Sequence, residues 1–305
     1  MSGGRSGLRL AEVARDEIRA GRFQRSMAVL TGFSAVVSGI EAYVQHGRGD
    51  FSDRWMWTPV WLTPPSVAAA GAALVSERAA RTMLPLAATL STADGVIGFL
   101  LHLRGIRRMP GGYGLGQYNV VMGPPVFAPL LMTSVGVLGF LAAALRPEKL
   151  PGRIALGDEP EGLPGPLERL AVQVSKGRFQ QGLAVTAAGF AVLSGGEAYL
   201  EHLRGSFNDP LMWAPVFVTP PMIISAVAAA FDRDAASTVL PLASMVTFGE
   251  GLLGFGLHLR GIRRMPGGFS NMRFNVTLGP PLFAPLLFTS VGLLGMLASI
   301  LRRSR

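Results

Sequence analysis

The chain of 305 residues contains no cysteine. Structural disulfides, iron–sulfur clusters held by thiolates, and covalent c-type haem attachment are therefore excluded. A cofactor held by side chains of this protein would have to use nitrogen, oxygen or thioether ligands. The sequence also lacks a glycine-rich phosphate loop and an H-E-x-x-H motif, so it gives no indication of a nucleotide hydrolase or a zinc protease.

Charged residues are scarce as well. They make up 15% of the chain against 49% hydrophobic residues, a balance too apolar for an ordinary soluble protein of this length. Long apolar stretches occur four times in each half, and each approaches the ~20 residues that a helix needs to cross a bilayer. They lie at residues 23–46, 56–76, 82–103, 120–145, 179–202, 212–232, 238–259 and 276–301. The sequence predicts an all-α integral membrane protein with eight transmembrane helices.

The two halves of the chain are copies of one another. Residues 21–145 reappear as 177–301 at a constant shift of 156 without gaps, and the longest identical segment reads L-H-L-R-G-I-R-R-M-P-G-G. Because each copy has an even number of predicted spans, both should insert in the same direction. We therefore expect two tandem four-helix bundles related by a pseudo-twofold axis along the membrane normal. The predicted organisation is an N-terminal segment, a first repeat, a linker and a second repeat, at residues 1–20, 21–145, 146–176 and 177–305.

The distribution of basic residues predicts the orientation. Eighteen of the 28 Lys and Arg residues fall on the side of the predicted spans that carries the N-terminus, the linker and the C-terminus. Both termini should therefore be cytoplasmic, in a multi-pass protein of the plasma membrane. Residues 1–20 would form either a short interfacial helix or a solvated lead-in. The net charge of +9 is explained by topology and by attraction to lipid headgroups, so nucleic acid is not an expected partner.

The second stretch is interrupted by Pro59, Pro64 and Pro65. A proline fits best in the first turn of a helix, where its missing N–H has no intrahelical partner in any case. The sequence therefore predicts that this membrane helix begins at the double proline, with Thr63 as its N-cap.

All four histidines of the chain occupy matching positions in the two copies. His46 and His102 each close the predicted outer end of a span, and their copies are His202 and His258. Two imidazoles at similar depth suggest the ligands of haem b, or of a non-haem iron, copper or zinc ion with Glu41 as a further ligand. Alternatively, each histidine is an interfacial residue that only forms hydrogen bonds.

Each copy also carries two carboxylates inside its predicted spans: Glu41 and Asp94 in the first, Glu197 and Glu250 in the second. An ionisable group at this depth is costly and usually faces the bundle interior or a water-filled cavity. These groups would serve as a proton relay or as additional ligands, and two held close together would share one proton. The alternative is that each is neutral or is paired with an arginine or a backbone donor.

Small residues and arginines surround each histidine in the sequence. Gly39 precedes His46 by seven residues, and Gly95 and Gly98 precede His102 by seven and four. Such a stripe either lets two helices approach closely or leaves room for a flat macrocycle. The repeated R-G-I-R-R segment is predicted to be a loop that binds propionates or other anions, or a structural clamp over the histidines. Its arginines are Arg104, Arg107, Arg108, Arg260, Arg263 and Arg264.

These features leave three hypotheses for the function. The favoured one is a membrane redox protein with one haem or metal site per repeat, which transfers electrons between quinone and a membrane or outer-face partner. The second is a transporter or a proton or anion pathway that uses the buried carboxylates. The third is a non-catalytic subunit that organises a larger membrane complex.

Overall fold

The computed structural model describes residues 22–144 and 178–301. Within these two ranges the regular structure is entirely helical, and no β-strand is present. The predicted N-terminal segment 1–20 and linker 146–176 lie outside the described residues. The all-helical fold class expected from the sequence is confirmed for the part of the chain that is described.

The two repeats contain the same helices in the same order. In the first repeat these are α2 (Arg22–Gly47), α3 (Thr58–Val75), α4 (Glu77–Arg81), α5 (Met83–Arg108), α6 (Gly116–Met122) and α7 (Leu130–Ala144). In the second they are α9 (Arg178–Arg204), α10 (Ala214–Phe231), α11 (Arg233–Ser237), α12 (Val239–Arg264), α13 (Met272–Leu278) and α14 (Leu286–Leu301). Short 3₁₀ turns precede α3, α6, α10 and α13, at Arg54–Trp57, Gly112–Leu115, Pro210–Trp213 and Gly268–Asn271.

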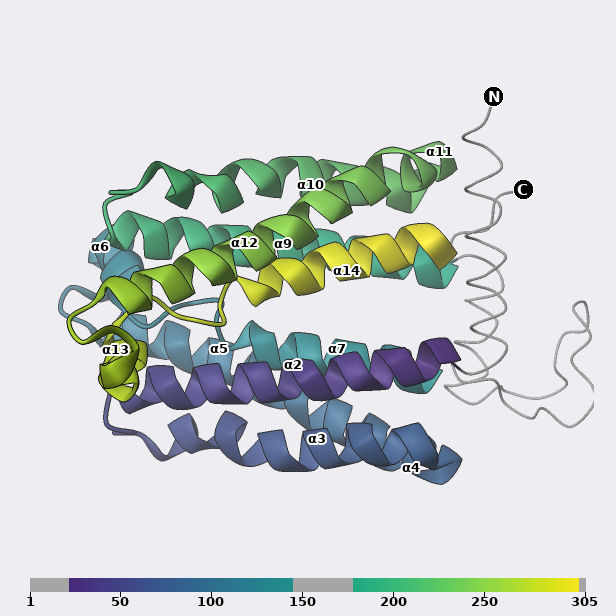
Figure 1. The fold of residues 1–305 in the computed structure, drawn as a ribbon, viewed down its shortest axis with the longest axis horizontal. Helices are drawn as coiled ribbons and strands as arrows, with labels where there is room; N and C mark the ends of the chain where they lie inside the picture. The colour runs from purple at the N-terminus through teal and green to yellow at the C-terminus, as the bar shows by residue number, and fades with distance from the viewer. Residues whose placement is uncertain (1–21, 145–177, 302–305) are drawn as a thin grey trace, which may run out of the picture.

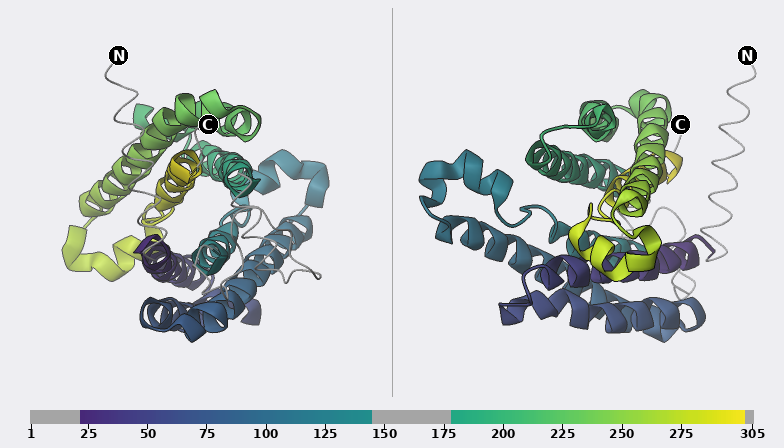
Figure 2. Two further views of the ribbon diagram at one scale, coloured as in Figure 1. Left: turned by 90° about the vertical axis from the view of Figure 1, so that its right-hand side faces the viewer. Right: turned by 60° about the vertical axis from the view of Figure 1, so that its left-hand side comes forward.

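The long helices run along the long axis of the molecule, and α6 and α13 lie at one end of it (Figure 1). We call this the capped end. α2 begins and α14 ends at the opposite end, so the chain enters and leaves the helical bundle on the same side (Figure 1). The repeats stand side by side (Figure 2), and each cap contacts the other repeat, α6 on α9 and α13 on α2.

Five helical segments among the described residues are long and apolar enough to cross a membrane: Arg25–Gly47, Glu77–Arg108, Gln180–Arg204, Pro210–Phe231 and Val239–Arg264. Three of the eight predicted spans are not among these five: α3, which has 18 residues, and the fourth span of each repeat. α7 has 15 residues and α14 has 16, which at 1.5 Å per residue reach about 22–24 Å of the ~30 Å hydrocarbon core. Proline explains the shortening, because Pro129 and Pro285 immediately precede α7 and α14 and have no backbone N–H.

The predicted start of the second span is wrong. α3 begins at Thr58 and continues through Pro64 and Pro65. The Thr63 hydroxyl donates to the Pro59 carbonyl at 2.9 Å inside this helix and caps no terminus. In a membrane helix, hydroxyl side chains and neighbouring helices compensate for the backbone donors that proline removes.

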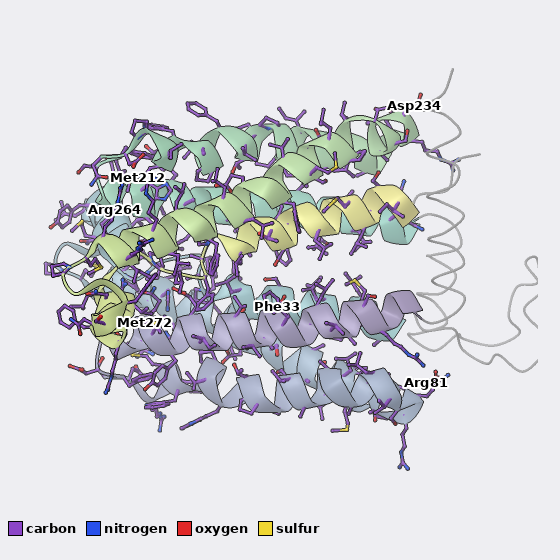
Figure 3. All side chains as sticks on the ribbon, viewed as in Figure 1. Phe33, Arg81, Met212, Asp234, Arg264 and Met272 are labelled. Atoms are coloured by element: carbon purple, nitrogen blue, oxygen red, sulfur yellow. The ribbon has the colours of Figure 1, made fainter. Side chains whose placement is uncertain are left out.

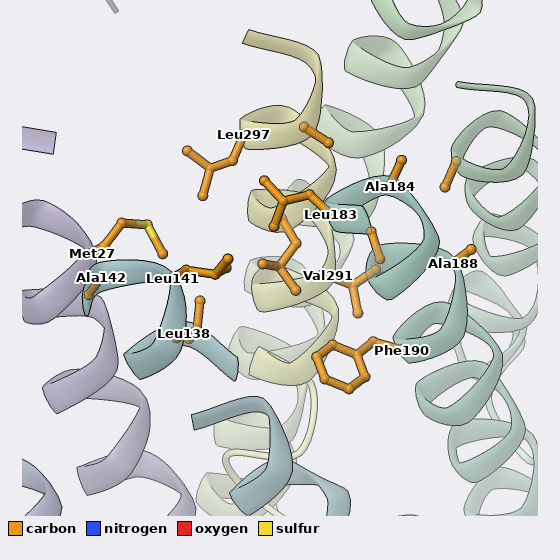
Figure 4. Packing of buried hydrophobic residues seen from close by; sticks show 14 of the residues in the cluster. Met27, Leu138, Leu141, Ala142, Leu183, Ala184, Ala188, Phe190, Val291 and Leu297 are labelled. Atoms are coloured by element: carbon orange, nitrogen blue, oxygen red, sulfur yellow. The ribbon is translucent and has the colours of Figure 1, made fainter. Parts of the chain in front are cut away.

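One continuous hydrophobic core joins the two repeats. It includes Met27 of α2, Leu138 of α7, Leu183 of α9 and Val291 of α14, all 3% exposed or less. Figure 4 shows these side chains from both repeats gathered in one region. The two bundles are therefore packed against each other and do not form separate bodies.

The stripe of small residues allows close contact between helices. A Cβ atom added at Gly39 would lie 2.0 Å from Thr63 Oγ1 of α3, and one at Gly95 would lie 2.6 Å from Thr133 N of α7. The second repeat has the same contacts, of Gly195 with Thr219 and Gly251 with Thr289. The neighbouring helices fill the space in front of these glycines, so at these positions the stripe serves helix packing and leaves no room for a macrocycle.

Candidate functional site

The structure brings the two histidines of each repeat together at the capped end. His46 comes from the last turn of α2 and His102 from α5, and their ring centroids are 6.3 Å apart at an interplanar angle of 65°. In the second repeat, His202 of α9 and His258 of α12 have centroids 6.5 Å apart at the same angle. The same pair of rings therefore forms twice in one chain.

Every histidine is anchored through its Nδ1 atom to a backbone carbonyl. The distances are 2.6 Å from His46 to Met56 O and 2.5 Å from His102 to Pro125 O. His202 and His258 make the same contacts, each at 2.6 Å, with Met212 O and Pro281 O. Because a carbonyl oxygen only accepts, Nδ1 must carry the proton, and Nε2 of the neutral ring is then the basic nitrogen. Within the described residues no hydrogen bond is formed by any of the four Nε2 atoms.

The phenylalanine beside the first histidine of each repeat, His46 or His202, was not identified from the sequence. The Phe51 ring lies edge-on to His46 with centroids 6.2 Å apart and stacks on Trp57 at 3.9 Å. Its backbone is left-handed, with φ of 49°, and Phe207 repeats this conformation with φ of 46°. A positive φ is strained for a bulky side chain and persists only where the surroundings enforce it. The signal available in the sequence was the recurrence of this phenylalanine at the shift of 156.

The two carboxylates of the first spans, predicted as relay groups or ligands, contact the opposite repeat. Glu41 Oε2 accepts a hydrogen bond from the backbone N–H of Phe283 at 2.9 Å, and Glu197 Oε2 accepts one from Phe127 N–H at 2.8 Å. Gln45 donates to the second oxygen of Glu41 at 2.5 Å. Of the roles expected from the sequence, these contacts correspond to a buried carboxylate that is paired with a backbone donor.

Two arginines that the sequence did not single out contact the opposite repeat as well. Arg204 donates to the carbonyls of Val121 and Gly123 at 2.7 and 2.6 Å. Arg48 donates in the same way to the carbonyls of Thr277 and Gly279. Partial burial lowers the pKa of Arg48 from its usual value, while the nearby Glu41 carboxylate acts in the opposite direction. A guanidinium presents its donors as a planar fork, which matches two carbonyls at the end of one short helix.

The carboxylates of the third spans have other partners. Asp94 accepts a hydrogen bond from the Thr58 hydroxyl at 2.5 Å. In the second repeat, alanine at 214 takes the place of this threonine, and Glu250 Oε2 is buried without a hydrogen-bond partner among the described residues. Glu41 and Asp94 thus engage different groups, in contrast to the predicted pair that shares one proton.

The six repeated arginines lie on helices and not in a loop, which corrects the prediction. Arg104, Arg107 and Arg108 belong to the last two turns of α5, and Arg260, Arg263 and Arg264 to the last two turns of α12. All six are exposed. Figure 3 shows Arg264 and Met212 at the capped end, whereas Arg81 and Asp234 lie at the opposite end.

A cavity of about 540 Å³ lies beside the histidines of the second repeat. His202, His258, Glu250, Arg260 and Arg264 line it, together with Arg48, Ala128 and Leu131 of the first repeat. In the described part of the chain no three histidine, aspartate or glutamate side chains are grouped closely enough to hold a metal ion. The three-ligand non-haem site expected from His46, His102 and Glu41 is therefore not assembled there.

Comparison of the chain with known protein families, with curated proteins and with solved structures gave no match.

Proposed function

We propose that this is a plasma-membrane redox protein of two four-helix repeats, with eight spans and a pseudo-twofold axis along the membrane normal. Each repeat binds haem b, or failing that a redox metal, between its two histidines. The protein then transfers electrons between quinone and a membrane or outer-face partner. The capped end faces outward and both termini are cytoplasmic.

The observation that carries this proposal is the histidine pair itself. Two imidazoles that coordinate one metal ion from opposite sides, at about 2.0–2.1 Å each, have centroids about 6 Å apart, whereas a tetrahedral arrangement brings them to about 5 Å. The separations of 6.3 and 6.5 Å correspond to the first arrangement. The two histidines of a repeat would be enough to hold haem iron, because the porphyrin would supply the remaining nitrogen ligands, so no third protein ligand would be needed.

The anchoring of Nδ1 supports the same conclusion. Histidines that bind a metal almost always donate their other ring N–H to a carbonyl or carboxylate, which fixes the tautomer and the direction of the ring. All four histidines have this contact. A histidine with only a structural role needs one such hydrogen bond, but that role does not explain why two rings are held face to edge in both repeats.

The volume and lining of the cavity beside the second site support a bound cofactor there. The cavity of about 540 Å³ falls within the ~300–1,000 Å³ of typical cofactor sites. Arg260 and Arg264 line its rim and would pair with propionates, and their first-repeat counterparts are Arg104 and Arg108.

Eight spans are compatible with the short α7 and α14. An irregular segment with the sequence G-P-P precedes each of them and would extend the crossing. Non-helical backbone at membrane depth is tolerated where the protein itself satisfies its polar groups. Glu197 and Arg204 satisfy two of these groups in the first repeat, the Phe127 N–H and the Gly123 carbonyl.

A pathway through the buried carboxylates is less well supported, because Glu41 and Glu197 already accept hydrogen bonds from the backbone of the opposite repeat. A non-catalytic subunit that only organises a membrane complex would bind no cofactor. Cofactor content therefore separates this hypothesis from the redox proposal.

The test is the metal content of the full-length protein purified in detergent, together with its reduced-minus-oxidised spectrum. We expect about two haem irons per chain, as one bis-histidine site per repeat requires. The double variants H46A/H102A and H202A/H258A should each keep one, and the quadruple variant should keep none. Tyr43→Phe, on the exposed face of α2 one turn from His46, is the matched control and should keep both.

Two results would overturn the proposal. One is a folded wild-type protein without stoichiometric iron, copper or zinc, which would favour the structural role. The other is a quadruple variant that binds as much metal as the wild type. An equal amount of copper in place of haem would retain the histidine site and replace the cofactor. Zinc would retain the histidine site but overturn the electron-transfer role, because Zn²⁺ has no redox chemistry.

A further inference from the structure

The segment that precedes each fourth helix brings its backbone polar groups to the boundary between the repeats. In the first repeat this segment, residues 123–129, connects α6 to α7 and includes Gly123, Pro125 and Phe127. Because it is not helical, its N–H and C=O groups need partners from elsewhere in the protein. Gly123 N–H donates to Asn119 O, and the carbonyls of residues 127–129 accept hydrogen bonds from the first turn of α7. The carbonyls of Gly123 and Pro125 and the N–H of Phe127 find partners on the histidine of the same repeat and on the first long helix of the other repeat.

The contacts alternate along this segment. Arg204 of the second repeat holds the Gly123 carbonyl, His102 of the first repeat binds the Pro125 carbonyl, and Glu197 of the second repeat holds the Phe127 N–H. The carbonyl that orients His102 therefore lies two residues from one contact with the opposite repeat and two residues from the other. Residues 279–283 are arranged in the same way: Arg48 binds Gly279, His258 binds Pro281 and Glu41 binds Phe283.

We propose that one histidine of each pair, His102 or His258, is oriented by the opposite repeat. Glu197 and Arg204 are positioning residues for the site of His46 and His102, and Glu41 and Arg48 are positioning residues for the site of His202 and His258. Each acts through a backbone carbonyl and touches no ligand. The positioning role concerns the histidine rings themselves, and its consequence for a cofactor rests on the proposed function.

This arrangement couples the two sites. Glu41 and His46 lie in the last two turns of α2, and Arg48 follows its end at Gly47. The same end of α2 therefore provides a histidine of its own site and, through Glu41 and Arg48, binds the backbone two residues on either side of the carbonyl that orients His258. A ligand that draws His46 inward also acts on α2, and through α2 on Pro281. By linkage, the effect of one site on the other must be reciprocal.

The test uses the fact that the full-length chain has only four histidines. Ring nitrogens labelled with ¹⁵N give four sets of NMR signals, which single histidine variants assign. In protein freed of metal, these signals report the Nδ1–H tautomer of each ring directly, without any cofactor. Two variants are compared. Glu197→Met removes the hydrogen-bond acceptor but keeps a side chain of similar length, and Glu197→Gln keeps a carbonyl acceptor for Phe127 N–H.

We expect the Met variant to lose the single Nδ1–H state of His102 and to leave His258 unchanged, while the Gln variant resembles wild type at both. Glu41→Met should have the reciprocal effect: His258 loses its single Nδ1–H state, and His102 does not change. The inference is overturned if the change falls on histidines of the repeat that carries the substitution. It is also overturned if the double variant Glu197→Met with Arg204→Met, folded by circular dichroism, changes no histidine.

A second measurement applies when the cofactor of the proposed function is bound. In a chain that retains only the first site, H202A/H258A, the Glu197→Met change should weaken cofactor affinity about 10–100-fold, as loss of an outer-shell partner does. In the reciprocal chain, H46A/H102A, it should not weaken it. If no variant binds cofactor, the proposed function fails, but the tautomer measurement still decides whether the opposite repeat orients the histidines.

Discussion

Gly95→Ala tests whether the small residues behind the histidines serve helix packing. A Cβ atom at this position would lie 2.6 Å from Thr133 N and 2.8 Å from Pro129 O, both backbone atoms of the fourth span. To restore an ordinary contact of about 3.4 Å, α7 would have to move by about 0.8 Å, and backbone in a packed interior does not yield cheaply. We expect the variant to lose about 1–3 kcal/mol of stability, the usual cost of overpacking.

Gly249→Ala is the matched control for this substitution. Gly249 lies inside α12 with no atom within 4 Å of its added Cβ, and the first repeat already has Ala93 at the equivalent position. This variant should gain about 0.5–1 kcal/mol, because alanine loses less backbone entropy than glycine in a helix. Reversible unfolding in mixed detergent micelles, followed by tryptophan fluorescence, measures both changes in the same protein.

Measuring the stability of the cofactor-free protein distinguishes the two roles of the small residues. If close helix contact is the role of Gly95, the loss of stability appears without any ligand. If instead the stripe leaves room for a macrocycle, Gly95→Ala should be as stable as wild type when empty and should bind less cofactor. Equal stability of the two empty proteins would therefore refute the packing argument.

Three further substitutions test individual contacts. Thr58→Ala removes the hydroxyl that donates a hydrogen bond to Asp94 and should lower the free energy of unfolding by about 1–3 kcal/mol. Adding Asp94→Glu, which reproduces the second repeat, should not recover this loss, because Glu250 there keeps a carboxylate oxygen without a hydrogen-bond partner among the described residues. Arg204→Lys should cost about 1–3 kcal/mol, because a single ammonium cannot bind two carbonyls as a guanidinium does. Asn119→Ala leaves two carbonyls of the turn after α5 without their hydrogen-bond donor. Limited proteolysis should therefore show increased cleavage in this turn and unchanged cleavage near His46.

The sequence predicted the parts of the fold that depend on local pattern. Apolar stretches placed α2, α3, α5 and their copies, and the shift of 156 predicted the repeated order of helices. The matching positions of the histidines at helix ends led to the pairs that the structure brings together. Each of these predictions uses residues of one repeat only, read along one helix at a time.

The remaining features depend on contacts that the sequence does not encode locally. Glu41 and Phe283 are separated by 242 positions, and Arg204 and Gly123 by 81. A pattern of polarity cannot show that a carboxylate in one copy will meet a backbone N–H in the other. The left-handed backbone of Phe51 was equally hidden, because phenylalanine has no preference for it and only its surroundings impose it.

The break in the fourth span explains why polar side chains of one repeat meet the backbone of the other. A continuous helix at residues 120–145 would satisfy its own backbone and would need no ionisable partners inside the membrane. Since proline prevents that helix before Leu130, the exposed N–H and C=O groups must be met by side chains at the same depth. Glu197, Arg204 and His102 do this in the first repeat. The break thus explains Glu197, Arg204 and the Nδ1 contact of His102, whereas Asp94 contacts Thr58 and Glu250 keeps one carboxylate oxygen without a hydrogen-bond partner among the described residues.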